Sequence, residues 1–404
     1  MASGRRSGAV KTGFGAVSKL EQLTVPEPTR IWHSDPPKLT REHVDEALLW
    51  AVDHNASDTV LMTDEPILMR IDGEYRRVTS RRLTAPELHE VLGDIYAPNA
   101  PSILAGGDAI DFAYRIQRSR DVELRFRVNA TSGQTQYSGH AVGMVLRSIA
   151  SVPPSLASQN VEDKIVRVHR QVAQSQGLVL CVGATGTGKT TLIAALLHDV
   201  LVTPPGRMVL TYESPIEYNL AAIPTRVGAV IQTEIPRHQP SFREGVANAL
   251  RRAPNVILIG EGRDAATLDG VVTAAQTGHA VYSTVHAHSV AATLPRIIGE
   301  FAPAQQRSIT ARLLDVLRLV VTQRLVPRVG GGRIALREYL EFDPDVRRSL
   351  IAADLERLQP EVHAWVERRG QSLLADAERK RADGLITHET YELIAAEWSG
   401  RHGA

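Results

Sequence analysis

Residues 183–190 read GATGTGKT, which fits the phosphate-binding pattern G-x-x-x-x-G-K-[ST] at every defined position. The loop follows an apolar run, Leu178 to Val182, that is typical of a buried parallel strand, and an apolar stretch typical of a helix begins at Leu192. Glycines let successive backbone N–H groups approach phosphate oxygens, and a helix N-terminus favours an anion. A chance match in a glycine-rich turn is the alternative, but the order of strand, loop and helix favours a nucleoside triphosphate site.

Two side chains of this loop are expected to contact the ligand directly. Lys189 is placed to reach the β- and γ-phosphates, and the Thr190 hydroxyl is placed to coordinate Mg²⁺. The predicted nucleotide-binding set is Gly183, Ala184, Thr185, Gly186, Thr187, Gly188, Lys189, Thr190 and Thr191.

Composition narrows the remaining classes of protein. The 404 residues are too many for one ordinary core, so two or three domains are expected. Lysine and arginine total 46 against 45 acidic residues, which gives no overall basic field and argues against direct nucleic-acid binding. Cys181 is the only cysteine, which excludes intrachain disulfides and four-cysteine metal sites and makes a reducing cytosol the natural compartment.

Targeting signals are also missing from the sequence. No stretch approaches the ~20 consecutive apolar residues of a membrane-spanning helix. Residues 1–19 include Arg5, Arg6 and Lys11 but lack the apolar segment of a secretory signal. We therefore expect a chain that is neither secreted nor membrane-spanning.

Changes in composition and periodicity divide the chain into five segments. A Gly-, Ser- and Pro-containing arm without sustained period is expected to be flexible, and a small α/β domain follows, with a capping box from Thr84 to Glu87. A Pro- and Ser-rich linker leads to the nucleotide domain, and a Leu-, Ala-, Glu- and Arg-rich helical segment ends the chain as a cap or docking surface. The predicted segments are residues 1–40, 41–150, 151–160, 161–345 and 346–404.

An alternating strand in the first domain carries two arginines on one face. Apolar residues from Val122 to Val128 alternate with charged ones, so Arg125 and Arg127 project together. One interpretation is a solvated sheet face. The other is that both arginines contact nucleotide phosphate.

Carboxylates follow two of the apolar strands in the nucleotide domain. The run Met208 to Tyr212 ends in the segment ESPIE, which contains Glu213 and Glu217, and Glu261 follows the run Val256 to Ile259, where a Walker B strand usually ends in aspartate. A water-activating base is expected among the first two, with an ion pair or helix cap as the structural alternative. Glu261 is expected to serve the Mg²⁺ shell or its water.

Histidines stand at both ends of a fourth apolar strand. His279 precedes and His286 follows the run Ala280 to Val285. Hydrogen-bonded histidines at strand ends and functional histidines are equally consistent with this spacing. A shared zinc ion is disfavoured, because the two ends of such a strand are separated by roughly 23 Å.

These runs together resemble the four boxes of the secretion ATPases of the PilT and GspE superfamily. GATGTGKT resembles the Walker A box, TYESPIEY at 211–218 the Asp box, NVILIGEGRD at 255–264 the Walker B box and TGHAVYSTVH at 277–286 the His box. The Asp box and the run EIPRH at 234–238 look like the DotB and TraJ branch, which serves type IVB secretion and conjugative transfer. The resemblance covers roughly residues 42–345.

The resemblance implies an α/β fold, with a PAS-like N-terminal α/β domain followed by a RecA-like P-loop ATPase domain and C-terminal helices. It implies a homohexamer with ATP and Mg²⁺ as cofactors and ATP between the two domains. It further implies a cytoplasmic protein associated peripherally with the inner membrane, through inner-membrane components of a secretion or conjugation apparatus.

The resemblance also implies roles for the candidate catalytic residues. Glu217 would polarise the attacking water, and Glu261 would complete the Walker B function and the Mg²⁺ site, with Thr190. His279 and His286 would sense the γ-phosphate or transmit its loss, and Arg125 and Arg127 would stabilise its charge. The catalytic set is Glu213, Glu217, Glu261, His279, His286, Arg125 and Arg127.

The sequence departs from the family pattern at two places, and three other functions remain as alternatives. Ser214 stands where most relatives have the Asp-box aspartate, and the C-terminal helical signature is only loosely echoed at residues 345–351. The expected function is a hexameric ATPase that performs mechanical work for a type IV secretion system of the IVB or conjugative kind. A pilus retraction motor is the nearest alternative, followed by a nucleic-acid translocase and by a non-catalytic nucleotide sensor.

Overall fold

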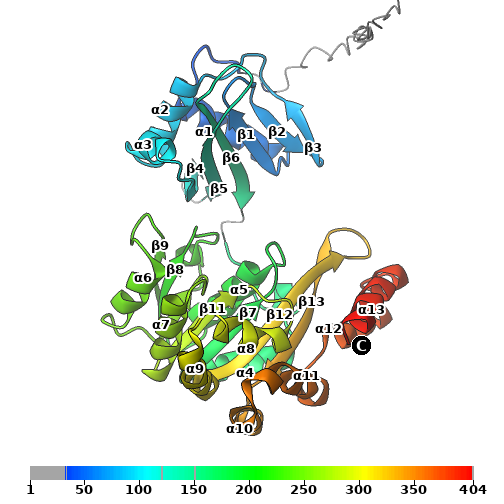
Figure 1. Ribbon diagram of the computed structural model, residues 1–404. Helices are drawn as coiled ribbons and strands as arrows, with labels where there is room; N and C mark the ends of the chain where they lie inside the picture. The colour runs from blue at the N-terminus through cyan, green and yellow to red at the C-terminus, as the bar shows by residue number, and fades with distance from the viewer. Residues whose placement is uncertain (1–31, 33, 120–121, 150–151, 403–404) are drawn as a thin grey trace, which may run out of the picture.

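The computed structural model describes residue 32 and residues 34–119, 122–149 and 152–402. Within them the chain forms an N-terminal domain and a larger C-terminal domain, with the first domain standing above the edge of the second that carries β8 and β9 (Figure 1). Each domain has its own apolar core. The α/β fold predicted from the sequence is confirmed.

The N-terminal domain is built on a six-stranded antiparallel sheet in the order β3-β2-β1-β6-β5-β4. Helices α1 and α2 bury their apolar sides in the same core as the sheet. Thr84 and Glu87 form the predicted capping box at the start of α2. The elements are α1 (Arg41–Asp53), β1 (Asp58–Met62), β2 (Leu68–Ile71), β3 (Glu74–Arg77), α2 (Ala85–Ile95), α3 (Ala100–Ala105), β4 (Ile110–Ser119), β5 (Val122–Gly133) and β6 (Ala141–Ile149).

The predicted arm does not extend to residue 40. Trp32 and Leu39 are fully buried in the core of the N-terminal domain, and the backbone N–H of Trp32 donates to the carbonyl of Val78. Burial of two large apolar side chains favours their packing over a flexible tether. The remainder of the predicted arm, residues 1–31 and 33, lies outside the described residues.

The C-terminal domain is built on a seven-stranded sheet in the order β13-β12-β7-β11-β10-β8-β9. All neighbouring strands are parallel except β13, which is antiparallel to β12. Their apolar, β-branched composition suits a sheet that is covered on both faces. The strands are β7 (Gly177–Val182), β8 (Met208–Glu213), β9 (Ala229–Glu234), β10 (Val256–Ile259), β11 (Ala280–Val285), β12 (Leu317–Pro327) and β13 (Arg333–Glu341).

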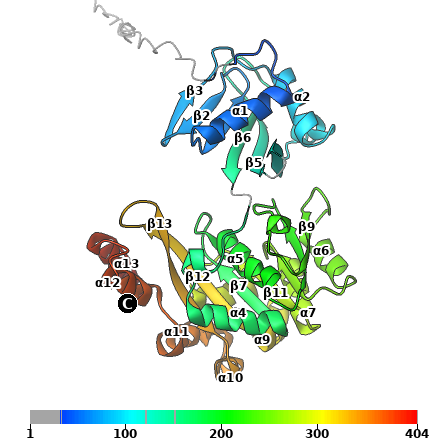
Figure 2. The same cartoon turned by 180° about the vertical axis from the view of Figure 1, so that it is seen from behind.

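Helices cover both faces of this sheet. The face that contains Val179 and Cys181 packs against α4 and α5, which lie toward the viewer in Figure 2. The face that contains Leu178 and Leu180 packs against α6 to α11. The helices are α4 (Asp163–Gln174), α5 (Lys189–Val202), α6 (Phe242–Ala249), α7 (Ala265–Gln276), α8 (Val290–Ile298), α9 (Pro303–Val316), α10 (Pro344–Ala352) and α11 (Leu358–Arg369), with the short turns η1 (Ala157–Gln159), η2 (Leu220–Ala222) and η3 (Leu355–Arg357).

The chain ends in two further helices, α12 (Leu373–Ala382) and α13 (His388–His402), which pack beside β13. The helical C-terminal segment therefore agrees with the prediction. The predicted linker is shorter than expected, because Leu156 is buried among residues of α4 and β7. None of the described helices is both long enough and apolar enough to cross a membrane.

Candidate functional site

The phosphate loop leaves β7 at the carboxyl edge of the parallel sheet and enters α5 at Lys189. Gly183, Gly186 and Gly188 have φ angles of +148°, +79° and +86°, a backbone region that residues other than glycine rarely adopt. A Cβ on Gly186 would meet no atom within 4 Å, whereas one on Gly188 would lie 2.5 Å from the Gln323 amide nitrogen. The loop is thus open at Gly186 and tightly packed at Gly188.

The Lys189 side chain contacts backbone carbonyls of the phosphate loop. Its Nζ donates to the carbonyl oxygens of Gly183 at 2.7 Å and Ala184 at 2.8 Å. Burial lowers the pKa of the amine, and the carboxylates of Glu261 and Glu217 act in the opposite direction. The loop, Glu217 and Glu261 therefore belong to one electrostatic site.

Glu261 and His286 come together at the ends of neighbouring parallel strands. Glu261 follows β10 and His286 follows β11, and these strands run in register. The His286 Nε2 lies 3.1 Å from one Glu261 oxygen, and the Arg263 Nε lies 2.7 Å from the other. Glu261 is thus oriented from two sides beside the phosphate loop.

Glu213 is the most strongly perturbed carboxyl group of the site. It ends β8 and is buried, where its Oε1 accepts hydrogen bonds from the Thr211 hydroxyl at 2.5 Å and the Gln232 amide at 3.0 Å. Burial raises the pKa of Glu213 to about 7, against the smaller lowering effect of these hydrogen bonds. A carboxyl group that titrates near neutrality suits a general base.

This perturbation predicts a pH-dependent stability difference for Glu213→Gln. Because the folded-state pKa is raised from 4.5 to about 7, wild-type stability falls as pH rises through this interval and then levels off. The amide does not ionise, so the variant should gain stability relative to wild type by up to about 3 kcal/mol between pH 4.5 and 8. Urea unfolding at both pH values measures this gain. Glu74→Gln, at a carboxylate whose side chain is 79% exposed, is the control, and parallel pH curves for wild type and Glu213→Gln would contradict the prediction.

The two arginines of β5 contact the Asp-box segment rather than solvent alone. Arg125 is 5% exposed, and its Nη2 donates to the carbonyl of Ile216 at 3.0 Å. Its Nε is buried without a hydrogen-bond partner, and burial lowers the pKa of the guanidinium. The Arg127 side chain is 42% exposed, and its Nη1 lies 3.4 Å from the Glu217 Oε1. The solvated-face interpretation is therefore wrong for Arg125, because the second domain covers it.

His279 lies away from this group of residues. It precedes β11, at the opposite edge of the sheet from His286, and its Nδ1 lies 3.0 Å from the carbonyl of Ala274 in α7. Strand length explains the separation, since successive residues of a strand advance by about 3.3 Å. The structure therefore brings His286 to the phosphate loop but does not bring His279 to the loop of its own chain.

The beginning of α5 offers further polar groups. Thr190 occupies the second position of the helix and is half-buried, and the Thr191 hydroxyl lies 3.0 Å from the hydroxyl of Tyr218. Among the described residues, no group of three or more His, Cys, Asp or Glu side chains is arranged to hold a metal ion. A cation here would take its ligands chiefly from nucleotide phosphates, water and Thr190, which is the ligand set typical of Mg²⁺.

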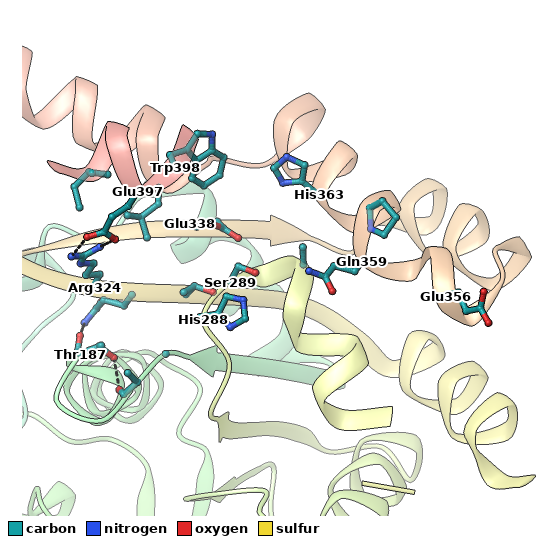
Figure 3. Close-up of a pocket in the computed structure, with 18 residues that line it drawn as sticks. Thr187, His288, Ser289, Arg324, Glu338, Glu356, Gln359, His363, Glu397 and Trp398 are labelled. Atoms are coloured by element: carbon teal, nitrogen blue, oxygen red, sulfur yellow. Dashed lines mark hydrogen bonds and ion pairs between the residues drawn. The ribbon is translucent and has the colours of Figure 1, made fainter. Parts of the chain in front are cut away.

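A cavity of about 750 Å³ opens on the other side of the loop, between the β12–β13 pair and the C-terminal helices. Thr187 lies at one end of it, and His363 and Trp398 come from the opposite wall (Figure 3). Arg324 pairs with Glu397 at 2.6 Å across this space. Sequence reasoning missed this wall, because β12 and the C-terminal helices are remote from the loop in the chain.

The geometry can be compared with known proteins. The model of the family described as type II/IV secretion system protein matches residues 111–331, which include the phosphate loop and both acidic strand ends. The chain is 30% identical over 346 residues to the type IV pilus retraction ATPase PilT of Pseudomonas aeruginosa, an alignment that covers 86% of this chain and 96% of that protein.

Solved structures show the same relationship. The Legionella pneumophila ATPase DotB superposes with a TM-score of 0.84 and 39% identity, covering 90% of this chain and 98% of that one. The pilus retraction motor PilT with bound ADP superposes with a TM-score of 0.73 and 28% identity, covering 88% and 96%. The similarity thus extends over both domains.

Proposed function

Because this chain belongs to the type II/IV secretion system protein family, we propose that it is a homohexameric ATPase that performs mechanical work for a type IVB or conjugative secretion system. One observation carries the proposal: the phosphate loop, Glu217 and Glu261 meet at one sheet edge, and arginines of the other domain contact the same segment. ATP hydrolysis at such a site would be coupled directly to movement of one domain relative to the other.

The residues divide the chemistry among them. Lys189 would bind the β- and γ-phosphates, and Thr190 would bind Mg²⁺, which supplies charge neutralisation when bound. Glu261, held by Arg263 and His286, would complete the cation's water shell. Glu217 remains the proposed residue that polarises water, and Glu213, whose pKa burial raises to about 7, would accept a proton.

The Asp-box segment is where the site contacts the N-terminal domain. Arg127 pairs with Glu217, Arg125 binds the Ile216 carbonyl, and the carboxylate of Glu234 accepts from the backbone N–H groups of Ala113 and Ile216. A γ-phosphate would compete for these arginines, and its loss would release them. Each catalytic cycle would thereby reset the angle between the domains.

Replacement of both Arg125 and Arg127 by alanine should lower kcat at least ~10-fold while changing the Kd for ATP much less, because finger-type arginines stabilise transition-state charge. The measurement is steady-state hydrolysis and equilibrium ATP binding on the full-length protein. The double replacement of Arg76 and Arg77 on β3, whose side chains are exposed, is the matched control. Unchanged turnover in the Arg125 and Arg127 variant would show that neither arginine takes part.

The similarity to DotB favours type IVB secretion over pilus retraction, since the identity is 39% with DotB and 28% with the PilT structure. The partners proposed are five further copies of this chain and inner-membrane components of the apparatus, with a cytoplasmic location at that membrane. A role for His279 would require the nucleotide of a neighbouring subunit. A nucleic-acid translocase is disfavoured by the net charge of +1.

Mg²⁺-dependent ATP hydrolysis and mass in solution test the proposal together. A hexamer that hydrolyses ATP, without stimulation by DNA, is the expected result. Deletion of the gene in its host should then abolish substrate transfer by the secretion system and leave twitching motility intact. Loss of twitching alone would favour pilus retraction, and an assembled but inactive protein would favour a nucleotide sensor.

A further inference from the structure

Gln323 of β12 contacts the outer side of the phosphate loop at both of its ends. Its Nε2 donates to the carbonyl of Thr187 at 2.8 Å, and Gln323 is only 4% exposed. Its own carbonyl oxygen lies 2.9 Å from the position that a Cβ on Gly183 would take, and its Nε2 lies 2.5 Å from that of Gly188. The loop therefore cannot move toward β12 without displacing this side chain.

Arg337 fixes the orientation of Gln323. The two residues are paired in register on β12 and β13, and the Arg337 Nε donates to the Gln323 Oε1 at 2.9 Å. The amide oxygen is thus directed at the guanidinium, and the amide N–H₂ is directed at Thr187. With a hydrogen bond at each end, Gln323 links the loop to Arg337.

The same guanidinium also binds the segment just before α4, which follows the interdomain linker. Arg337 Nη1 donates to the carbonyl of Asn160 at 3.0 Å and to Glu162 at 3.2 Å, and Nη2 donates to the carbonyl of Gln159 at 3.0 Å. All three nitrogens of a side chain that is 1% exposed are therefore used. A continuous path of hydrogen bonds joins Thr187 in the phosphate loop to the residues at which the chain enters this domain.

Glu162 pairs with the buried Arg337 guanidinium at 3.2 Å, and Asp376 binds the Arg337 backbone. Glu162, at the start of α4, lies within 3.7 Å of Arg379 and Lys380, and Asp376 accepts from the Arg337 backbone N–H at 2.8 Å and from Lys380 at 2.6 Å. A buried charge is retained only when it is paired in this way. Arg337 is thus tied to the start of α4 through Glu162 and to α12 through Asp376.

We propose that Gln323 is a positioning residue for the phosphate loop, and that Arg337 transmits the loop's nucleotide state to residues 159–162, where the chain coming from the interdomain linker enters α4. The inference rests on the proposed function, in which the loop binds ATP. A bound triphosphate attracts the N–H groups of the loop. The Thr187 carbonyl and the Gln323 amide that donates to it must therefore change position together. Misplacement of a positioned group by ~1 Å can reduce a rate ~100-fold, so this contact affects turnover as well as movement.

The substitution Gln323→Glu tests the hydrogen bond to Thr187 separately from the hydrogen bond to Arg337. The carboxylate keeps an acceptor for Arg337 but replaces the donor to Thr187 by an oxygen that repels its carbonyl. We expect kcat for ATP to fall at least ~10-fold, with a smaller change in the Kd for a fluorescent ADP analogue and a similar melting temperature. Gln305→Glu, at an exposed glutamine of α9, is the matched control and should behave as wild type. If Gln323→Glu does not fold, Gln323→Met, which is uncharged and of similar volume, takes its place.

Hydrogen exchange of residues 157–162, with and without the ADP analogue, distinguishes transmission from a merely structural contact. Wild type should show nucleotide-dependent exchange there, and Gln323→Glu with bound nucleotide should not. Wild-type turnover and exchange in the variant would overturn this inference alone. A wild-type protein that binds no nucleotide would overturn the proposed function and this inference with it.

Discussion

Lys189→Ala is expected to abolish measurable nucleotide binding. The Lys189 side chain is 9% exposed, and its Nζ reaches into the loop, where it contacts the carbonyls of Gly183 and Ala184. Alanine removes the one cationic side chain of the loop, residues 183–190. The hydrogen bonds of a charged group to phosphate are worth about 1.5–3 kcal/mol each, so two of them correspond to at least ~100-fold in Kd. Titration with a fluorescent ATP analogue measures the loss.

Folding controls separate this effect from general damage. Burial lowers the pKa of Lys189 and so opposes the charged form in the absence of nucleotide, whereas the two hydrogen bonds to the loop carbonyls favour the folded state. The variant should therefore melt close to wild type. Lys38→Ala, at an exposed lysine that pairs with Glu90, should bind nucleotide normally. Tight binding by a folded Lys189→Ala protein would refute the assignment of the loop.

Glu261→Gln is expected to bind ATP and fail to hydrolyse it. Glutamine preserves the shape of the side chain but loses the charge that faces Lys189, Arg263 and His286. Removal of a catalytic carboxylate of this kind lowers kcat by about 100-fold or more, whereas phosphate binding by the loop remains. Single-turnover hydrolysis and equilibrium binding of ATP measure the two properties separately.

The control for Glu261→Gln is an identical replacement outside the site. Glu300→Gln removes a carboxylate from a surface pair with Arg296 and should leave turnover unchanged. Hydrolysis by Glu261→Gln at the wild-type rate would remove Glu261 from the Mg²⁺ shell. Loss of ATP binding would instead indicate that this carboxylate serves to hold the loop in shape.

Local sequence patterns predicted the elements of this fold because they depend on residues close together in the chain. The strand, loop and helix around Lys189, the acidic ends of β8 and β10, and the Thr84 to Glu87 capping box all agree with the structure. The alternation in β5 also predicted that Arg125 and Arg127 share a face. It contained no information on what covers that face.

The parts of the site that the sequence did not reveal depend on packing between distant segments. Gln323 is 136 positions from Thr187, and Arg337 is 178 positions from Gln159, yet each pair is hydrogen-bonded. Neither residue belongs to a repeating pattern, so no local signal marks it. Likewise, the boundary at residue 40 depended on whether Trp32 finds an apolar core to fill.

Sequence by itself thus determined the chemistry: a loop that accepts phosphates, carboxylates at the ends of parallel strands, and the family to which these boxes belong. Tertiary structure alone decided which charges are buried, as with Arg125 beneath the Asp-box segment and Arg337 beside Glu162. The physical reason is that secondary structure and its side-chain periodicity depend mainly on residues close together in the chain. Burial and its effect on pKa arise only when remote elements pack together.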